Sequence, residues 1–205
     1  MLIKSSQTSN RNNQKSFNNK DNSNQQNRKN REMYDFNLLI SCSWGAYRRA
    51  KEEVLSVLKT LGDEKPIVRR TVAEGIIGVK TRLDPREFIR GLRTLFDTDP
   101  FILQQTLKWV PVDLWTWSEM DSMREAVAEL KNKIQAGERW RMTVEKRRYT
   151  RHHKIEIIRE LAELIDEKVD LEEPDKILRI DIIGKYAGVS VLTPQDVFSV
   201  AKPLP

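Results

Sequence analysis

The sequence predicts a mixed α/β (α+β) fold that follows a disordered tail, and three observations support this prediction. Residues 4–31 are almost entirely Ser, Asn, Gln, Lys and Arg, a composition that buries too little apolar surface to offset the entropy lost on ordering. From residue 36 onward, short apolar runs alternate with segments in which apolar residues recur at helical spacing. Glycine, proline and helix-capping residues separate these segments. We therefore expect a tail over residues 1–35 and two domains, over residues 36–112 and 113–205.

The pattern over residues 36–112 is that of a ferredoxin-like βαββαβ domain. Gly62 is typical of the position just after a helix, and Asp84 followed by Pro85 and Glu87 is typical of a helix N-terminus. The expected elements are, in order, a strand at residues 36–42, a helix at 50–61, strands at 67–71 and 75–80, a helix at 85–98 and a strand at 105–110.

Residues 113–205 predict a second α/β unit. Ser118, with Asp121 three residues later, indicates the capped start of a helix whose apolar stripe ends at Gly137. In residues 139–144 apolar and polar side chains alternate, which is typical of a half-buried strand. The remaining expected elements are a helix at residues 152–168 that buries Ile155, Ile158, Leu161, Ala162 and Ile165, and strands at 177–183 and 189–192 separated by residues 184–188.

Composition excludes several classes of protein. No apolar run approaches the ~18 residues of a membrane-spanning helix, and the polar residues that follow Ile3 do not form a secretory signal. The single cysteine, Cys42, excludes a disulfide scaffold and a cysteine-cluster metal site. We therefore expect a cytoplasmic protein that has no membrane partner.

The sequence offers no catalytic constellation. Its glycines lack the GxGxxG and GxxxxGK[ST] spacings of phosphate-binding loops. His152 and His153 are adjacent, which would direct them about 100° apart on a helix, so they do not form a metal site. Cys42 ends an apolar run and is more typical of a core residue than of a nucleophile. We expect no catalytic residues, no metal and no cofactor.

Positive charge is concentrated in one segment of the second unit. Of the net charge of +6, the 35 residues of the tail contribute 7 − 3 = +4, so the location of charge within the folded part is more informative than its sum. Residues 139–154 contain seven basic residues and one acid, whereas residues 156–175 contain nine acids and two bases. The basic segment leads into a predicted helix. The unpaired backbone N–H groups at the helix N-terminus and the guanidinium groups of the segment would both favour phosphate binding.

These observations predict an RNA-binding surface. Tyr149 is expected to stack on an unpaired base, as is Trp140 if it lies outside the core. The alternative is that the basic residues only keep a sheet edge soluble. The residues expected to contact phosphates are Arg139, Arg141, Lys146, Arg147, Arg148, Arg151 and Lys154.

A second basic stripe lies on the helix of residues 85–98. Arg86, Arg90 and Arg93 recur at helical spacing on the face opposite the apolar residues, and we include them among the expected RNA-binding residues, with an ordinary solvated helix face as the alternative. Three tryptophans between residues 109 and 117 are more typical of an interdomain core than of base-stacking platforms.

Several segments resemble the THUMP domain family. Residues 168–192 (KVDLEEPDKILRIDIIGKYAGVSVL) are similar to the C-terminal half of a THUMP domain, and most similar to stand-alone THUMP proteins of the tRNA-acetylation adaptor type. Residues 140–148 (WRMTVEKRR) resemble the basic strand of that family, and residues 108–112 (KWVPV) resemble the segment that leads into the domain. The resemblance covers about residues 36–200.

The resemblance implies a tRNA-binding protein that is not itself an enzyme. It implies contact with the acceptor-stem region of tRNA, recognised by shape and length, and a separate cytidine acetyltransferase partner that forms N4-acetylcytidine. By the same resemblance we expect no modifying domain after the THUMP domain.

Three alternatives remain open at the level of sequence. The chain is alternatively an RNA-binding subunit of another split tRNA-modifying enzyme, of the methyltransferase or thiolation type. A small enzyme on a ferredoxin-like scaffold would require a cleft that joins His152, His153 and a carboxylate. A protein-interaction module would expose a large apolar patch near residues 109–117.

Overall fold

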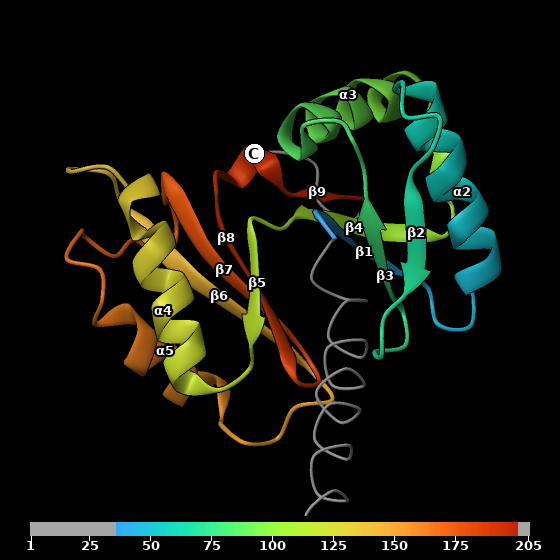
Figure 1. Ribbon diagram of the computed structural model, residues 1–205. Coiled ribbons are helices and arrows are strands. Elements are labelled where there is room, and N and C mark those ends of the chain that lie inside the picture. Colours follow the sequence, from blue (N-terminus) through green and yellow to red (C-terminus); the bar gives the residue numbers. More distant parts are fainter. Residues whose placement is uncertain (1–35, 201–205) are drawn as a thin grey trace, which may run out of the picture. The chain divides into compact units, whose positions relative to one another are not determined.

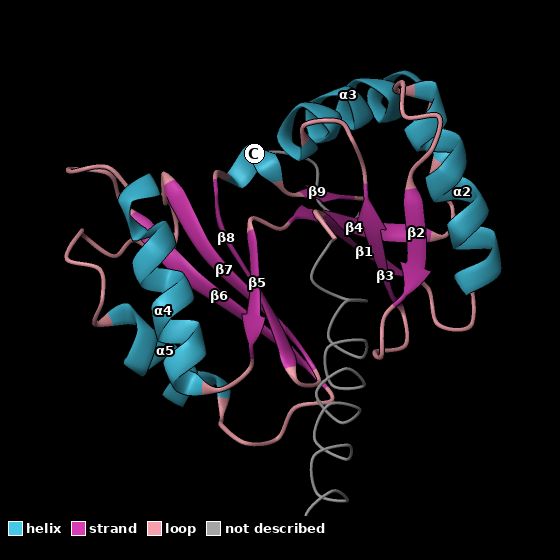
Figure 2. Ribbon diagram, viewed as in Figure 1, coloured by secondary structure: helices cyan, strands magenta, loops and turns pink. Residues whose placement is uncertain are grey.

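The computed structural model describes residues 36–200, in which two β-sheets and four α-helices are formed (Figures 1 and 2). The predicted tail over residues 1–35 lies outside the described residues. Each sheet carries two of the helices on one face (Figure 2). The predicted mixed α/β fold class is therefore confirmed. Within residues 36–200 no helix is both long enough and apolar enough to cross a bilayer.

The first sheet has the strand order of a ferredoxin-like fold. Its order is β2-β3-β1-β4-β9, with all neighbours antiparallel. The elements that build it are β1 (Leu38–Cys42), α2 (Tyr47–Thr60), β2 (Ile67–Arg70), β3 (Ile76–Lys80), α3 (Pro85–Thr98), a 3₁₀ turn (Pro100–Ile102), β4 (Thr106–Pro111) and β9 (Phe198–Ser199). The two-residue strand β9 comes from the far end of the sequence and is too short to be predicted from periodicity.

Local signals explain where the helices of this sheet begin and end. Asp84 Oδ1 accepts hydrogen bonds from the backbone N–H groups of Arg86 and Glu87, each at 2.9 Å, so the predicted N-cap of α3 is confirmed. Gly62 follows α2 with a φ of +103°, a conformation that favours glycine. Side chains of β1, α2 and α3 that face inward, including Leu38, are fully buried in a core between the helices and the sheet.

The second sheet has the order β5-β8-β7-β6, in which only the β6–β7 pair is parallel. The predicted strand at residues 139–144 extends through Arg147. The elements of this sheet are β5 (Leu114–Trp117), α4 (Met120–Leu130), β6 (Trp140–Arg147), α5 (Lys154–Ala162), β7 (Lys176–Ile183) and β8 (Tyr186–Leu192), with 3₁₀ turns at Lys131–Lys133 and Pro194–Asp196.

Four expectations about the second unit are wrong in detail. The helix predicted at residues 152–168 is shorter and spans Lys154–Ala162. Ser118 is not an N-cap: Glu119 holds that position, while Ser118 is buried and its Oγ donates to Gly184 O at 3.1 Å. Ile155 is 61% exposed, and Ile157 is buried in its place. Isoleucines on both faces of α5 make two helical phases compatible with the sequence, and packing against the sheet selects the phase. Strand β8 begins at Tyr186, so only two residues form the turn.

The other faces of the two sheets meet through a small apolar cluster. This cluster contains Trp115, Ile183 and Tyr186 of the second sheet. They pack against Phe36, which precedes β1, and Leu39, which lies in β1. The indole Nε1 of Trp115 donates to Phe36 O at 2.7 Å. The prediction that Trp115 belongs to a core rather than to a stacking platform is therefore confirmed.

Gly78 makes the packing of Phe36 possible. A Cβ atom at this position would lie 2.3 Å from Cδ2 of the Phe36 ring. Since no real Cβ approaches an atom so closely, a side chain here would displace the ring.

The domain boundary between residues 112 and 113 remains a prediction. Strand β9, at the end of the described residues, pairs with β4 and so belongs to the first sheet.

Candidate nucleic-acid interface

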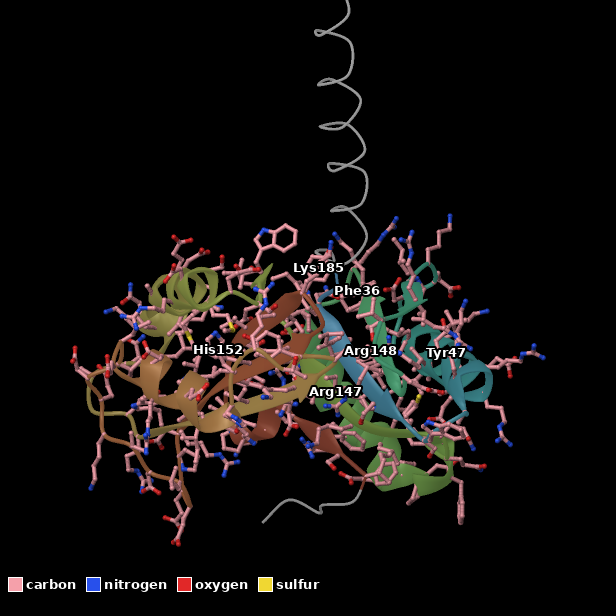
Figure 3. The ribbon with its side chains drawn as sticks, turned by 90° about the horizontal axis from the view of Figure 1, so that it is seen from below. Phe36, Tyr47, Arg147, Arg148, His152 and Lys185 are labelled. Carbon is pink, nitrogen blue, oxygen red and sulfur yellow. The ribbon has the colours of Figure 1, made fainter. Side chains whose placement is uncertain are left out.

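The C-terminal end of β6 places two arginines beside the β7–β8 turn. Arg147 is the last residue of β6, and its carbonyl accepts a hydrogen bond from Gly184 N at 2.9 Å. Arg148 follows with a φ of +53° and an exposed side chain. Lys185, in the same turn as Gly184, is also exposed (Figure 3). We call Arg147, Arg148 and Lys185 the β6-end cluster. The two arginines are among the residues predicted from the sequence to bind RNA, and the lysine is not.

Tyr149 anchors the loop that follows the cluster. Its side chain is buried, and its hydroxyl donates to Ser118 O at 3.0 Å. Burial raises the pKa of the Tyr149 hydroxyl. This position does not support the expected stacking of Tyr149 on a base, because the ring is buried in the core between the second sheet and its helices. The burial of Tyr149 could not be predicted from the sequence, because it is a single aromatic residue in a basic segment.

Two other basic residues, at the end of β6 and in the loop after it, contact other parts of the chain. Lys146 Nζ donates to His152 O and lies 5.7 Å from the centre of the Tyr149 ring. Arg151 Nη1 lies 2.9 Å from Glu119 Oε1, but both side chains are largely exposed, so this pair is weak. Lys146 and Arg151 therefore flank the β6-end cluster, together with the exposed Lys154 at the start of α5.

The N-terminus of α5 already holds a carboxylate of the chain. Glu156 Oε2 accepts a hydrogen bond from His153 N at 2.9 Å and lies 3.6 Å from His152 Nδ1. The hydrogen bond from His153 N lowers the pKa of the Glu156 carboxyl. Phosphate capture at this helix end remains a prediction, and the Glu156 carboxylate opposes it. The geometry favours the β6-end cluster as the anion site instead.

Arg139 and Arg141 lie at the opposite end of β6. Arg141 lies six positions and Arg139 eight positions before Arg147, at about 3.3 Å per residue of strand. Arg139 Nη1 lies 3.0 Å from Asp170 Oδ2, and Arg139 Nε lies 3.5 Å from Asp175 Oδ2. Arg141 Nη1 donates to the Leu171 carbonyl at 3.1 Å. The structure therefore does not bring these two arginines together with the β6-end cluster.

Two of the α3 arginines have structural partners. Arg86 Nη2 lies 2.7 Å from Asp113 Oδ1 and donates to Val191 O at 3.0 Å. Arg93 Nη2 donates to the carbonyls of Gln195 and Val197 at 2.9 and 3.2 Å. Both arginines thus attach α3 to the end of the second sheet and the segment before β9.

An open cleft near α3 is less positive than its composition suggests. It has a volume of about 530 Å³ and is lined by the basic residues Arg86, Arg90, Lys133 and Lys176. Arg90 Nη2 lies 3.4 Å from Glu87 Oε1, Lys133 Nζ 3.1 Å from Asp113 Oδ2, and Lys176 Nζ 3.6 Å from Glu138 Oε1. Because each base has a carboxylate nearby, this cleft is a weaker anion site than the β6-end cluster.

A smaller cleft of about 280 Å³ lies between the sheets beside Arg147. Its floor contains Arg179, only 7% exposed, which makes two hydrogen bonds to Asp181 at 2.7 and 2.8 Å. Burial opposes the charge of Arg179, but Asp181 outweighs burial and raises the pKa of the guanidinium. Asp181 therefore already neutralises Arg179, while Arg147, which also lines the cleft, has only a long ion pair of 3.9 Å with Glu145. Among residues 36–200, no group of three or more His, Cys, Asp or Glu side chains is arranged to hold a metal ion.

Residues 118–192 match the family model of the THUMP domain, so the chain contains a THUMP domain. The β6-end cluster lies inside this matched segment. No match was found among the curated proteins. The solution structure of the THUMP domain of THUMP domain-containing protein 1 is 24% identical, with a TM-score of 0.32, over 35% of this chain and 81% of that chain.

Two larger solved structures share the fold of the chain. The crystal structure of PH1313 from Pyrococcus horikoshii Ot3 is 14% identical with a TM-score of 0.55, covering 76% of this chain and 54% of that chain. The crystal structure of TrmN from Thermus thermophilus is 16% identical with a TM-score of 0.51, covering 77% and 46%. The chain therefore spans about half the length of these two proteins.

Proposed function

We propose that the chain is an RNA-binding protein of tRNA modification, in which the β6-end cluster holds phosphates of the tRNA. The THUMP domain is an RNA-binding module, and the cluster lies within it. The observation that carries the proposal is the charge balance of the cluster. Arg147 Nη1 is 3.9 Å from the nearest carboxylate oxygen, of Glu145, and within residues 36–200 no ion pair is formed by Arg148 or Lys185.

In the finer form of this proposal, the chain is an adaptor that does not catalyse a reaction. It presents tRNA, through contacts in the acceptor-stem region, to a separate cytidine acetyltransferase that forms N4-acetylcytidine. The similarity of residues 168–192 to the tRNA-acetylation adaptors supports this form. The second candidate is an RNA-binding subunit for a separate methyltransferase or thiolation enzyme, which the same cluster would serve equally well.

A binding experiment with tRNA tests the common part of the proposal. The double variant Arg147→Glu/Arg148→Glu is expected to weaken tRNA binding on the order of 100-fold, because two lost charged contacts at about 1.5 kcal/mol each amount to about 3 kcal/mol. The matched control is Lys59→Glu/Lys65→Glu, which makes the same change in net charge at two exposed positions, one in the last turn of α2 and one in the loop after it. Electrophoretic mobility shifts measure both. Equal losses in the two variants would show that net charge, rather than this site, determines binding.

Nucleoside mass spectrometry distinguishes the adaptor forms. Deletion of the gene is expected to remove N4-acetylcytidine from tRNA, and the Arg147→Glu/Arg148→Glu protein is expected to restore less of it than the wild type. Unchanged N4-acetylcytidine together with loss of a methylated or thiolated nucleoside would replace the acetylation form with the second candidate.

A further inference from the structure

Trp44 is an exposed aromatic residue on a fixed turn. Its side chain is 85% exposed in the connection between β1 and α2. The backbone on either side is held by two hydrogen bonds, from Ser43 N to Gln105 O at 3.0 Å and from Ala46 N to Ser43 O at 3.1 Å. The turn therefore presents a large apolar ring to solvent without any core packing to explain it.

The neighbours of Trp44 line a cleft of about 370 Å³. Ser43 and Gly45 form part of its wall, together with the β2–β3 hairpin at residues 71–75. Arg70 also lines it and lies 4.0 Å over the ring of Tyr47. This cation–π contact holds the Arg70 guanidinium over the tyrosine ring at the wall of the cleft.

Arg148 reaches the same cleft from the other sheet. Val72 Cγ2 of the hairpin would lie 3.2 Å from a Cβ at Gly184, which shows how closely the hairpin approaches the β7–β8 turn. In Figure 3, Arg148 lies between Tyr47 and the strands of the second sheet. Among residues 36–200, Arg148 is the only non-glycine residue with a positive φ. Such a conformation in a charged residue is typical of functional sites.

The charges of this cleft are not balanced by acids. Two arginines and one acid, Glu74, line it. Within the described part of the chain the Arg148 side chain forms no ion pair or hydrogen bond. The first turn of α2, which begins beside Trp44, also carries no acidic residue, in contrast to α5 with Glu156. An anion entering the cleft would therefore meet two guanidinium groups without displacing a carboxylate.

We propose that this cleft binds one unpaired nucleotide of an RNA, with the phosphate held by Arg70 and Arg148 and the base stacked on Trp44. This inference rests on the proposed function and extends the RNA surface to residues outside the THUMP match. An exposed indole offers a π-face to any base but no hydrogen bonds to base edges. The site therefore selects a single-stranded segment rather than a sequence.

Two RNAs test the inference: a hairpin with a four-nucleotide single-stranded extension, and the same hairpin with a blunt end. Trp44→Ala is expected to weaken binding of the extended hairpin about 5- to 140-fold, the range for loss of one stacked base, and to change blunt-hairpin binding less than about twofold. Trp44→Phe should restore most of the difference. The control Phe101→Ala removes another exposed aromatic side chain, 79% exposed, and is expected to have no effect on either RNA.

The outcomes separate this inference from the proposed function. If the wild type binds neither tRNA nor the hairpins, the proposed function fails. If the wild type binds and Trp44→Ala binds the extended hairpin as the wild type does, or loses affinity equally for both hairpins, only the stacking site is overturned. Thermal unfolding of Trp44→Ala is expected to match that of the wild type because the ring is exposed, so a loss of binding is not a loss of folding.

Discussion

Arg148 combines a charge with an unfavourable backbone conformation. An L residue with a φ of +53° costs about 1 kcal/mol or more relative to the common conformations, and glycine adopts it freely. Arg148→Gly is therefore expected to raise the free energy of unfolding by about 0.5–1 kcal/mol, after allowing for the larger entropy of glycine in the unfolded chain. The same variant should weaken RNA binding, since the guanidinium is lost. Urea denaturation and RNA titration measure the two effects.

Arg148→Ala is the control for this prediction. It removes the charge but keeps a Cβ in the left-handed conformation, so it should weaken RNA binding as much as Arg148→Gly without the gain in stability. A gain in stability for alanine equal to that for glycine would mean that the backbone at this position is not strained.

Residue roles were harder to predict from the sequence than residue types. The seven basic residues between 139 and 154 are evident in the sequence, but their partners are not. Asp170 and Asp175, which pair with Arg139, are over 30 positions away and become neighbours only because β6 and β7 run parallel. Trp44 carried no signal because a lone tryptophan between serine and glycine has no apolar period.

At the scale of elements, periodicity and capping residues predicted the first sheet in full except for β9. The second sheet was predicted less well. Strand β5 contains two tryptophans that were predicted to belong to an interdomain core rather than to a strand, and α5 has apolar residues on two faces. In both cases the deciding factor is packing against a partner element, which local sequence does not encode.

Asp63 joins the end of α2 to the connection between β3 and α3. Its buried carboxylate accepts hydrogen bonds from Thr81 Oγ1 at 2.5 Å and from the backbone N–H groups of Arg82 and Lys65, each at 3.1 Å. Burial opposes ionisation, but these hydrogen bonds outweigh it and hold the pKa of Asp63 below its usual value. Asp63→Ala leaves three donors without this acceptor and is expected to cost about 1–3 kcal/mol at pH 7.

The pH dependence of this cost follows from the lowered pKa. A carboxyl whose pKa is lower in the folded state stabilises the protein above the unfolded value, near 3.9, and this contribution is lost as the pH falls from there through the folded value. The difference in unfolding free energy between wild type and Asp63→Ala should therefore shrink below about pH 4. Urea denaturation from pH 7 to pH 3 measures it. A difference that stays constant over this range would assign the cost to packing alone.

At the scale of the whole molecule, positive residues divide into those that hold the fold together and those directed to solvent. Arg86 and Arg93 connect α3 to the second sheet and the segment before β9, and Arg139 fixes the acidic loop before β7. In the β6-end cluster, Arg147 has only a long, partly exposed ion pair of 3.9 Å with Glu145, and Arg148 and Lys185 form no ion pair within residues 36–200. Net charge therefore overestimates how many cations are available to an RNA, which is why the sequence alone predicted a larger binding surface than the geometry favours.

The dependence of RNA affinity on salt distinguishes the two classes of arginine. Each phosphate contact contributes a slope of about −0.7 to −0.9 to a plot of log K against log salt concentration. Arg148→Gln should reduce the magnitude of the slope by about that amount, because its guanidinium has no carboxylate partner within residues 36–200. Arg139→Gln and Arg86→Gln should leave the slope unchanged and lower stability instead, because their guanidinium groups already have carboxylate partners. If all three variants reduced the slope equally, the RNA would have to displace those acids, and the β6-end cluster would no longer be a distinct site.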